Sequence, residues 1–336
     1  MSDKNTATGM GVRKMPVSKD DEGITLDRWF KRNVPELTHV RLQKLMRKGD
    51  VRLDGKRVKG KEHVAAGQVV RVPPIGTIPD QRARAAREPA ALSDADIAEI
   101  RSMVLYMDDS VIVLNKPAGL PTQGGTGQTR HIDGLLDGLR YDSKYRPKLV
   151  HRLDKDTSGV LLIGRTPNAT AALAKGFQSK ECDKRYFALV CGVPDAREGR
   201  IKLTMDKVPG KYGEKMQVTE DGKKSMTDYF VVENAARRAA WLSLKPHTGR
   251  THQLRLHTAE MGTPIVGDGK YGGAEAYLTG AISRKLHLHA RFISFPHPDG
   301  GMMTATAPLA EHMQASWEML DFDLDGYVDR FTEEDA

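Results

Sequence analysis

Groups that can do chemistry are concentrated in one nine-residue segment, HRLDKDTSG, at residues 151–159. It holds two carboxylates, a histidine, two further basic side chains and two hydroxyls. The apolar sequences on either side, KLV and GVLLIG, are typical of strands, so the segment is predicted to be a loop between rigid walls. A carboxylate held in this way can act as a nucleophile or a base, and Asp154 and Asp156 are the candidates.

Other interpretations of this loop stay open on residue types alone. Asp156-Thr157-Ser158-Gly159 can form an ordinary turn. The two carboxylates can form a glycosidase-like pair, although nothing in the sequence fixes their separation. Ser158 does not lie in a G-x-S-x-G sequence, so a hydrolase nucleophile is not indicated. Composition therefore leaves catalysis and turn formation equally open here.

A second polar segment, KPHTGRTHQLRLHTAEMGTPIVGDGKYGG, occupies residues 245–273. Its histidines His247, His252 and His257 are five residues apart, which does not match H-E-x-x-H, and no thiol accompanies them. A zinc site is therefore not indicated. The glycine-rich TQGGTGQ at residues 122–128 lacks the G-K-[ST] of a P-loop and is predicted to be an ordinary loop.

Within the second segment, Thr251 is predicted to cap a helix that ends at Gly262. The apolar stripe of this helix consists of Leu254, Thr258 and Met261. Arg255 lies on the same helix and can reach an aspartate from another strand. The alternative is a surface salt bridge, worth at most about 1 kcal/mol.

The elements that must position these groups mix strands and helices without a regular βαβ rhythm. Residues 104–106 and 111–114 are predicted to be strands joined by a tight acidic turn. The expected fold class is α+β, with a small N-terminal α/β module and a larger domain built on a mainly antiparallel mixed sheet.

Positive charge is concentrated near the N-terminus. Residues 24–74 contain 13 Lys and Arg and 5 Asp and Glu, a net charge of +8 that equals the net charge of the whole chain. The remaining sequence is therefore neutral overall. This concentration predicts a module that binds a polyanion.

The basic module has recognisable elements. A helix is predicted over THVRLQKLMRKG, with Thr38 as N-cap and Gly49 just past its end. VRLDGKRV alternates around an Asp54-Gly55 turn and predicts a hairpin, and GQVVRVPP predicts a closing strand. An ordinary solvated basic face is the alternative, but the basic helix runs into a basic hairpin, which favours RNA binding. The basic residues of the helix are Arg41, Lys44, Arg47 and Lys48.

The predicted domain organisation has five parts. They are a disordered tail (1–20), the basic module (21–75), a linker with a short helix near residues 93–100 (76–100), the larger domain (101–325) and an acidic C-terminal tail (326–336). The chain has no apolar run long enough to span a membrane, no signal-peptide core and only two cysteines, Cys182 and Cys191. A cytoplasmic location is therefore expected.

Six segments in one order resemble the RluA-type pseudouridine synthases. They are LNKPAGLPT, HRLDKDTSG, KRYFALVCG, GRTHQLRLH, GDGKYGG and LHLHARFISFPHP. The basic module resembles the small S-four RNA-binding module in LDRWF, RLQKLMRKGDVRLDGKRV and GQVVRV. The combination resembles the members that act on large-subunit ribosomal RNA. The resemblance implies an isomerase that converts uridine to pseudouridine without a cofactor or metal.

The resemblance also implies roles for individual residues. Asp154 matches the essential aspartate, Arg255 the arginine paired with it, and Tyr186 the tyrosine that stacks on uracil and is a candidate base for the carbon-five proton. Arg152 is expected to help to flip the target nucleotide, and His151 to shape the loop. Lys116, Arg250 and Gln253 are further candidates for phosphate contact or loop support.

The implied partner is large-subunit ribosomal RNA or a pre-ribosomal particle, with no membrane and a monomeric chain as the expectation. Two alternatives remain. One is a non-catalytic RNA-binding ribosome-assembly factor that uses the basic module alone. The other is a hydrolase that uses Asp154 and Asp156 and releases free base or sugar.

Overall fold

The computed structural model describes residues 11–74, 92–125, 130–179, 181–210 and 213–332. The chain divides into two compact units, Met1–Ala91 and Leu92–Ala336. No helix in the described parts of either unit is long and apolar enough to cross a bilayer.

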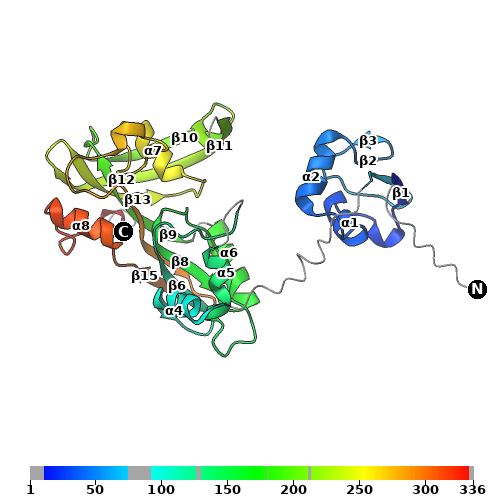
Figure 1. Cartoon of the computed structure of the whole chain (residues 1–336), viewed down its shortest axis with the longest axis horizontal. Coiled ribbons are helices and arrows are strands. Elements are labelled where there is room, and N and C mark those ends of the chain that lie inside the picture. The colour runs from blue at the N-terminus through cyan, green and yellow to red at the C-terminus, as the bar shows by residue number, and fades with distance from the viewer. Residues whose placement is uncertain (1–10, 75–91, 126–129, 180, 211–212, 333–336) are drawn as a thin grey trace, which may run out of the picture. The chain divides into compact units, whose positions relative to one another are not determined.

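The N-terminal unit is a four-stranded sheet with two helices (Figure 1). The strand order is β1-β4-β2-β3, and all pairs are antiparallel. Its elements are β1 (Arg13–Pro16), η1 (Lys19–Asp21), α1 (Leu26–Asn33), α2 (His39–Lys48), β2 (Arg52–Leu53), β3 (Lys56–Arg57) and β4 (Val69–Val72).

Residues 13–20 correct the prediction of a disordered tail up to residue 20. Residues 13–16 form β1, which pairs with β4. Met15 packs against the core of the unit, and Val17, just after the strand, is 3% exposed. The burial of these two apolar side chains stabilises a strand that is too short to be recognised by its pattern.

The predictions for the helix and the hairpin of this unit are confirmed. Thr38 is the N-cap of α2, and Gly49 is its C-cap with φ of 79°, a left-handed conformation that favours glycine. Asp54 and Gly55 both have positive φ and connect β2 to β3, as a tight hairpin turn requires.

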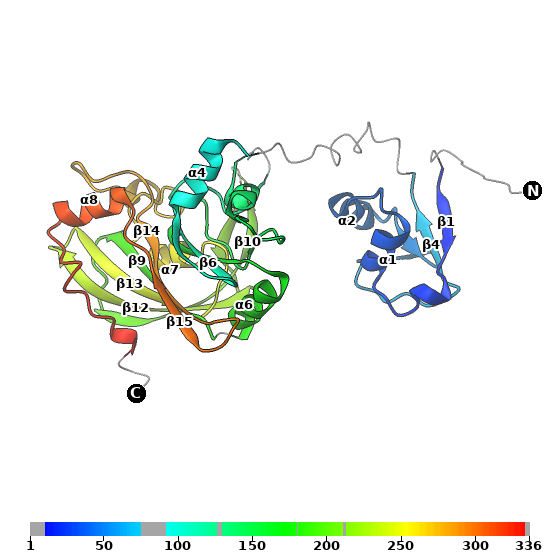
Figure 2. The same cartoon turned by 90° about the horizontal axis from the view of Figure 1, so that it is seen from below.

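The C-terminal unit is built on an eleven-stranded sheet (Figures 1 and 2). The strand order is β11-β10-β12-β13-β9-β14-β8-β6-β5, with β15 beside β14 and β7 beside β8. Only β14 and β8 pair in parallel among the described strands, so the predicted α+β class with a mainly antiparallel sheet is confirmed. The strands are β5 (Val104–Met107), β6 (Val111–Lys116), β7 (Lys148–Leu149), β8 (Ser158–Gly164), β9 (Asp183–Cys191), β10 (Glu198–Gly210), β11 (Gly213–Val218), β12 (Lys223–Ala235), β13 (Ala239–Pro246), β14 (Leu288–Pro296) and β15 (Met302–Thr306).

Helices cover both faces of this sheet. They are α4 (Asp94–Ser102), α5 (Ile132–Leu135), α6 (Pro167–Ser179), α7 (Gln253–Glu260) and α8 (Glu311–Met319), with the short 3-10 helices η2 (Leu136–Leu139), η3 (Gly273–Ala276) and η4 (Arg330–Thr332). The helix predicted inside the linker is α4, and Ser93 caps it in a capping box with Asp96. Most of the predicted linker, residues 76–91, lies outside the described residues.

Alternation along β9 decides which residues face which helix. Phe187 and Leu189 belong to a cluster with Trp317 of α8. Ala188 and Val190 belong to a different cluster, on the α7 side of the sheet. Since side chains alternate along a strand, Tyr186 projects on the same side as Ala188. It contacts this cluster and also the cluster beneath α4 and α5.

An acidic tail was predicted from residue 326, but residues 327–331 pack on the domain. The Tyr327 ring centroid lies 4.7 Å from that of Phe187, and Phe331 is 9% exposed. Asp329 accepts hydrogen bonds from the Arg185 guanidinium. The aromatic side chains among the acidic residues therefore hold this segment on the domain up to residue 332.

Candidate active site

The loop with the essential-aspartate candidate connects β7 to β8 and is held from behind by the segment after β6. Thr122 Oγ1 donates a hydrogen bond to the Leu153 carbonyl at 2.7 Å and accepts one from the Leu153 N–H at 3.2 Å. The Gly119 N–H donates to the Lys155 carbonyl at 2.9 Å. These bonds lie on both sides of Asp154 and fix its backbone.

Lys116 belongs to the same support. It is fully buried, and its Nζ donates to the carbonyls of Pro117, Leu120 and Lys155 at 2.8–3.0 Å. Burial lowers the pKa of Lys116 to about 7, against the opposing charges of Asp156 and Asp154. Of the two expected roles, phosphate contact and loop support, these contacts favour loop support, because all three donors are used internally.

His151 also serves the protein interior. Its Nε2 accepts a hydrogen bond from the Leu162 N–H at 2.9 Å, and its ring stacks on Phe177 with centroids 4.5 Å apart. Burial, together with the charge of Lys184, lowers the pKa of His151 to about 3. A neutral, internally bonded ring is consistent with the expected role of His151 in shaping the loop.

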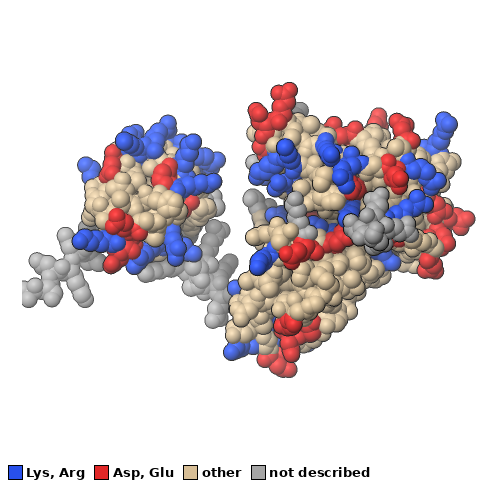
Figure 3. Space-filling view, turned by 180° about the vertical axis from the view of Figure 1, so that it is seen from behind, with Lys and Arg blue, Asp and Glu red and all other residues tan. Residues whose placement is uncertain are grey.

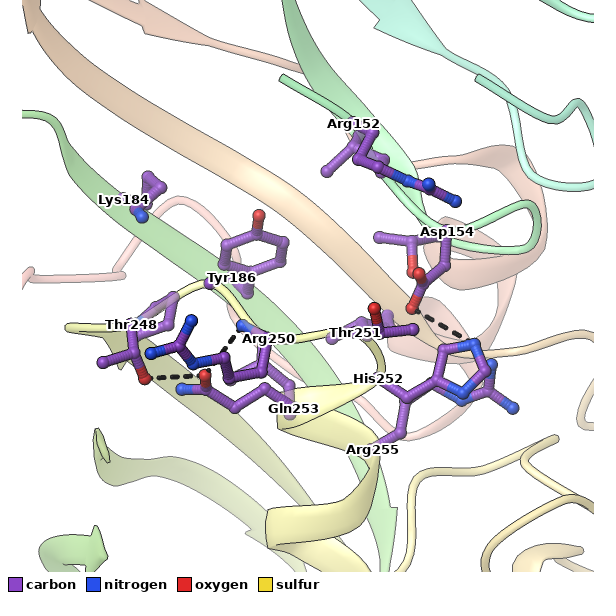
Figure 4. A pocket seen from close by; sticks show the side chains of 16 residues that line it. Arg152, Asp154, Lys184, Tyr186, Thr248, Arg250, Thr251, His252, Gln253 and Arg255 are labelled. Atoms are coloured by element: carbon purple, nitrogen blue, oxygen red, sulfur yellow. Dashed lines mark hydrogen bonds and ion pairs between the residues drawn. The ribbon is translucent and has the colours of Figure 1, made fainter. Parts of the chain in front are cut away.

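The three predicted catalytic side chains line one pocket of about 150 Å³ (Figure 4). Asp154 comes from the β7–β8 loop, Tyr186 from β9 and Arg255 from α7. The Asp154 carboxylate side chain is 22% exposed and therefore open to a substrate. Asp156 does not line this pocket, which argues against a glycosidase-like pair.

The pairing of Arg255 differs from the expectation. Its Nε and Nη2 donate to the two carboxylate oxygens of Asp268, both at 2.7 Å, and the Asp268 side chain is fully buried. No ion pair between Arg255 and Asp154 occurs in this structure, because Asp268 already occupies the guanidinium fork. Burial by itself lowers the pKa of Arg255, but the hydrogen bonds and charge of Asp268, followed by the charge of Asp154, raise it.

His252 is the side chain that lies next to Asp154, and sequence reasoning missed it. Its Nε2 lies 3.9 Å from Asp154 Oδ2, and its Nδ1 shares a hydrogen bond of 2.8 Å with the Tyr271 hydroxyl. His252, rather than Thr251, is the N-cap of α7, with φ of 52°. A non-glycine residue held in this conformation beside a pocket is typical of functional sites.

Tyr271 and Asp268 complete this arrangement. The Tyr271 N–H donates to Asp268 Oδ1 at 3.2 Å, and Arg255 lies 5.2 Å from the Tyr271 ring centroid. Burial lowers the pKa of His252, partly offset by Asp154. The neutral ring is therefore favoured beside the carboxylate. Asp268 and Tyr271 both lie in GDGKYGG, a segment that the sequence analysis noted only as part of the family resemblance.

Tyr186 and Arg152 present free polar ends to the pocket. In the described part of the chain, neither side chain makes a hydrogen bond or ion pair. Burial, and then the charge of Asp154, raises the pKa of Tyr186 above its ordinary value, so the phenol stays protonated. Arg152 is exposed at the mouth of the pocket (Figure 4).

Gln253 and Arg250 divide into one supporting and one exposed residue. Gln253 is 4% exposed, its Oε1 accepts from Thr248 and the Arg250 N–H, and its Nε2 donates to Met226 and Thr227. Its hydrogen-bonding groups are all used within the protein, which favours loop support over phosphate contact as its role. Arg250 is exposed and lines the pocket, so it remains a candidate for RNA contact.

Three buried histidines lead us to expect that the stability of the domain depends on pH. Burial lowers the pKa of His257, His287 and His289 to about 4. Each has a ring nitrogen within 2.8 Å of a buried serine hydroxyl: Ser225, Ser316 and Ser158 in that order. The remaining histidine of the second polar segment, His247, instead contacts the Asp228 carboxylate at 2.7 Å.

We expect this domain to lose stability as the pH falls from about 6.5 toward 4. The unfolded histidines bind protons in this window while the buried ones do not, so each can contribute up to about 1.4 kcal/mol per pH unit. Urea unfolding at pH 7, 6 and 5 tests this. His289→Gln should unfold with a shallower pH dependence than the parent protein, and an unchanged slope would contradict the assignment.

Comparison with known proteins agrees with this geometry. Residues 110–260 match the family model described as RNA pseudouridylate synthase. The chain is 35% identical to "Ribosomal large subunit pseudouridine synthase C" of Haemophilus ducreyi, over 90% of the chain and 94% of that protein. It is 33% identical to "RNA pseudouridine synthase 4, mitochondrial" of Arabidopsis thaliana, over 90% and 80%. The fold of the solved structure "Human RNA Pseudouridylate Synthase Domain Containing 4" is similar, with a TM-score of 0.57 and 23% identity over 68% of this chain and 96% of that one. The chain therefore belongs to the RluA-type family of RNA pseudouridine synthases, which are isomerases.

Proposed function

We propose that this chain converts specific uridines of large-subunit ribosomal RNA to pseudouridine, with Asp154 as the essential carboxylate. The observation that carries the proposal is the meeting of Asp154, Tyr186 and Arg152 around one pocket in a chain of this family. The relatives named as ribosomal large-subunit enzymes support the choice of RNA. The compartment that holds such RNA in bacteria, the cytoplasm, is the proposed location.

The reaction breaks the bond from the ribose C1′ to N1 of uracil and forms a bond from C1′ to C5. The proton on C5 is lost and N1 gains one, so atoms and electrons balance without an oxidant. Asp154 acts on the sugar, either by attacking C1′ or by removing a ribose proton. Both routes need the ionised carboxylate. The Arg255 guanidinium and the Asp268 carboxylate balance each other, so this pair adds no net charge near Asp154.

Stacking on the uracil is the role that we propose for Tyr186. Because its pKa is raised, its phenol stays protonated and would have to lose its own proton before it could accept the one from C5. Its ring lines the pocket, where it offers a face on which the uracil can stack. The target nucleotide must first leave its stack, which requires a few kcal/mol. Arg152, exposed at the mouth without a partner among the described residues, can fill the space that the base leaves.

The N-terminal unit is proposed to be an S-four-like RNA-binding module. Lys44, Arg47 and Lys48 are exposed on α2, and Arg41 is half-buried. Arg52 and Arg57 follow on the exposed hairpin. Figure 3 shows Lys and Arg side chains gathered over the side of this unit that carries these elements. Such a surface suits contacts to phosphate and RNA shape.

Replacing Lys44, Arg47 and Lys48 together with glutamine should weaken RNA binding and lower its salt dependence. Each lost phosphate contact lowers the slope of log K against log salt by roughly 0.7–0.9. The measurement is a binding titration on a ribosomal RNA transcript at several salt concentrations. Lys14→Gln with Lys19→Gln, exposed positions outside α2, is the control. Equal slope changes in both variants would contradict the assignment to α2.

The proposed function is tested by mapping pseudouridines in large-subunit ribosomal RNA from cells with and without this gene. Purified protein should also release tritium from carbon-five-labelled uridine in transcripts of the mapped region. RNA binding without tritium release would favour the alternative of an assembly factor. Release of free uracil or ribose would favour a hydrolase.

A further inference from the structure

A second hollow opens beside the candidate active pocket. It has a volume of about 760 Å³ and shares with the pocket residues that include Arg152, Lys184, Tyr186 and Arg250. Lys245, Phe177 and Gln178 are among the residues that line the second hollow alone. We call it the side groove. Because the two hollows share a wall, an RNA strand that leaves the pocket can continue into the side groove.

Lys184 is one of three cations that line both hollows, together with Arg152 and Arg250. Figure 4 shows it on the pocket side. It lies two residues before Tyr186 on β9, so both side chains project from the same side of the strand. Its side chain is half-buried, and its Nζ lies 5.9 Å from the ring centroid of Phe177. Across the described residues, this ammonium makes no hydrogen bond or ion pair.

The neighbouring carboxylate is already engaged. Asp183, which also lines the side groove, contacts the Arg185 guanidinium and lies 3.7 Å from the Lys245 ammonium. It therefore has two other cations to balance. A half-buried cation whose neighbouring carboxylate is shared with two other cations is unfavourable. Burial lowers the pKa of Lys184, although the nearby Cys182 and Asp183 oppose this. An anionic ligand that enters the groove would relieve this.

The lining of the side groove is mainly positive, which favours an anionic ligand. Its lining includes four Lys and Arg, at positions 152, 184, 245 and 250, and one carboxylate, Asp183. Arg152 and Arg250 are exposed. A lysine is a compact point charge that suits a phosphate oxygen, and in RNA the phosphates are the anions.

We propose that Lys184 binds a backbone phosphate next to the flipped uridine and that the side groove holds the RNA strand continuing from it. This inference rests on the proposed function for its ligand, RNA. It assigns to the groove a binding role that is separate from the chemistry at Asp154. The phosphate contact anchors the strand where it bends into the pocket.

The first test is the affinity of Lys184→Met for a ribosomal RNA fragment that the wild-type protein binds. A charge-assisted contact contributes about 1.5–3 kcal/mol, so binding should weaken roughly 10- to 100-fold. The salt slope should fall by roughly 0.7–0.9. Lys184→Arg should restore most of both, and Lys175→Met, an exposed residue on α6 outside both hollows, should change neither. Thermal unfolding of each variant shows that it is folded.

The second test replaces one phosphate of the RNA at a time with a neutral methylphosphonate. At one position the wild-type protein should lose as much affinity as Lys184→Met does, and Lys184→Met should lose nothing further. If no position couples to Lys184, or if only turnover falls while affinity and salt slope stay unchanged, the proposal is overturned. These are binding measurements, so they give an answer even where no pseudouridine forms and the proposed function itself fails.

Discussion

Asp154→Asn is expected to abolish pseudouridine formation and to leave RNA affinity within about twofold. The substitution keeps the size of the side chain but removes the negative charge that, in the proposed reaction, attacks the sugar or takes its proton. Loss of a group that acts in the reaction itself lowers turnover by about 10⁴-fold or more. The backbone of the loop should be unchanged, since its carbonyls accept hydrogen bonds from Thr122, Gly119 and Lys116.

The matched control is Asp156→Asn. Asp156 carries the same charge two residues away but is exposed and does not line the pocket. Its turnover should stay within a fewfold of the wild-type value in the tritium-release assay. Single-turnover rates and binding titrations on the same transcript separate the two effects. Near-normal turnover in Asp154→Asn, or an equal loss in both variants, would remove Asp154 from the reaction.

Asp268→Ala is expected to destabilise the catalytic domain by about 3–5 kcal/mol, because it leaves the buried Arg255 guanidinium without its partner. The free energy of unfolding is measured with urea. The control is Asp137→Ala, which breaks a pair between Arg146 and Asp137 whose side chains are 38% and 35% exposed. Such an exposed pair contributes at most about 1 kcal/mol.

A double substitution separates stability from activity at this pair. Arg255→Met with Asp268→Leu removes both charges and should be clearly more stable than Asp268→Ala alone. It should still be poorly active, because the pocket loses the guanidinium beside His252 and Tyr271. If the double variant is as unstable as Asp268→Ala, the uncompensated charge of Arg255 is not the cause of the lost stability.

The sequence predicted the elements that local pattern determines. The caps of α2 at Thr38 and Gly49 depend on conformational preferences of single residues. Asp154 and Tyr186 were found because their motifs resemble those of a family, and the structure brings both to one pocket. Local composition alone left the Asp154 loop open between catalysis and an ordinary turn.

Tertiary contacts determined what the sequence could not predict. Asp268 follows Arg255 by 13 residues through a loop, and only the folded chain decides that its carboxylate, and not that of Asp154, reaches the guanidinium. The sequence left Lys116 open between phosphate contact and loop support, and only the fold shows that three carbonyls converge on its buried ammonium. Strand β1 was missed because its pairing partner lies more than fifty residues away.

The alternation along β9 has a consequence for how this protein can change. A shift of one residue in that strand would bring the phenyl group of Phe187 into the pocket and would push the Tyr186 hydroxyl into the aromatic cluster beneath α8. Single side-chain replacements in β9 affect one face at a time. An inserted or deleted residue there would damage the core and the lining of the pocket together, so the length of this strand is far less free to vary than its composition.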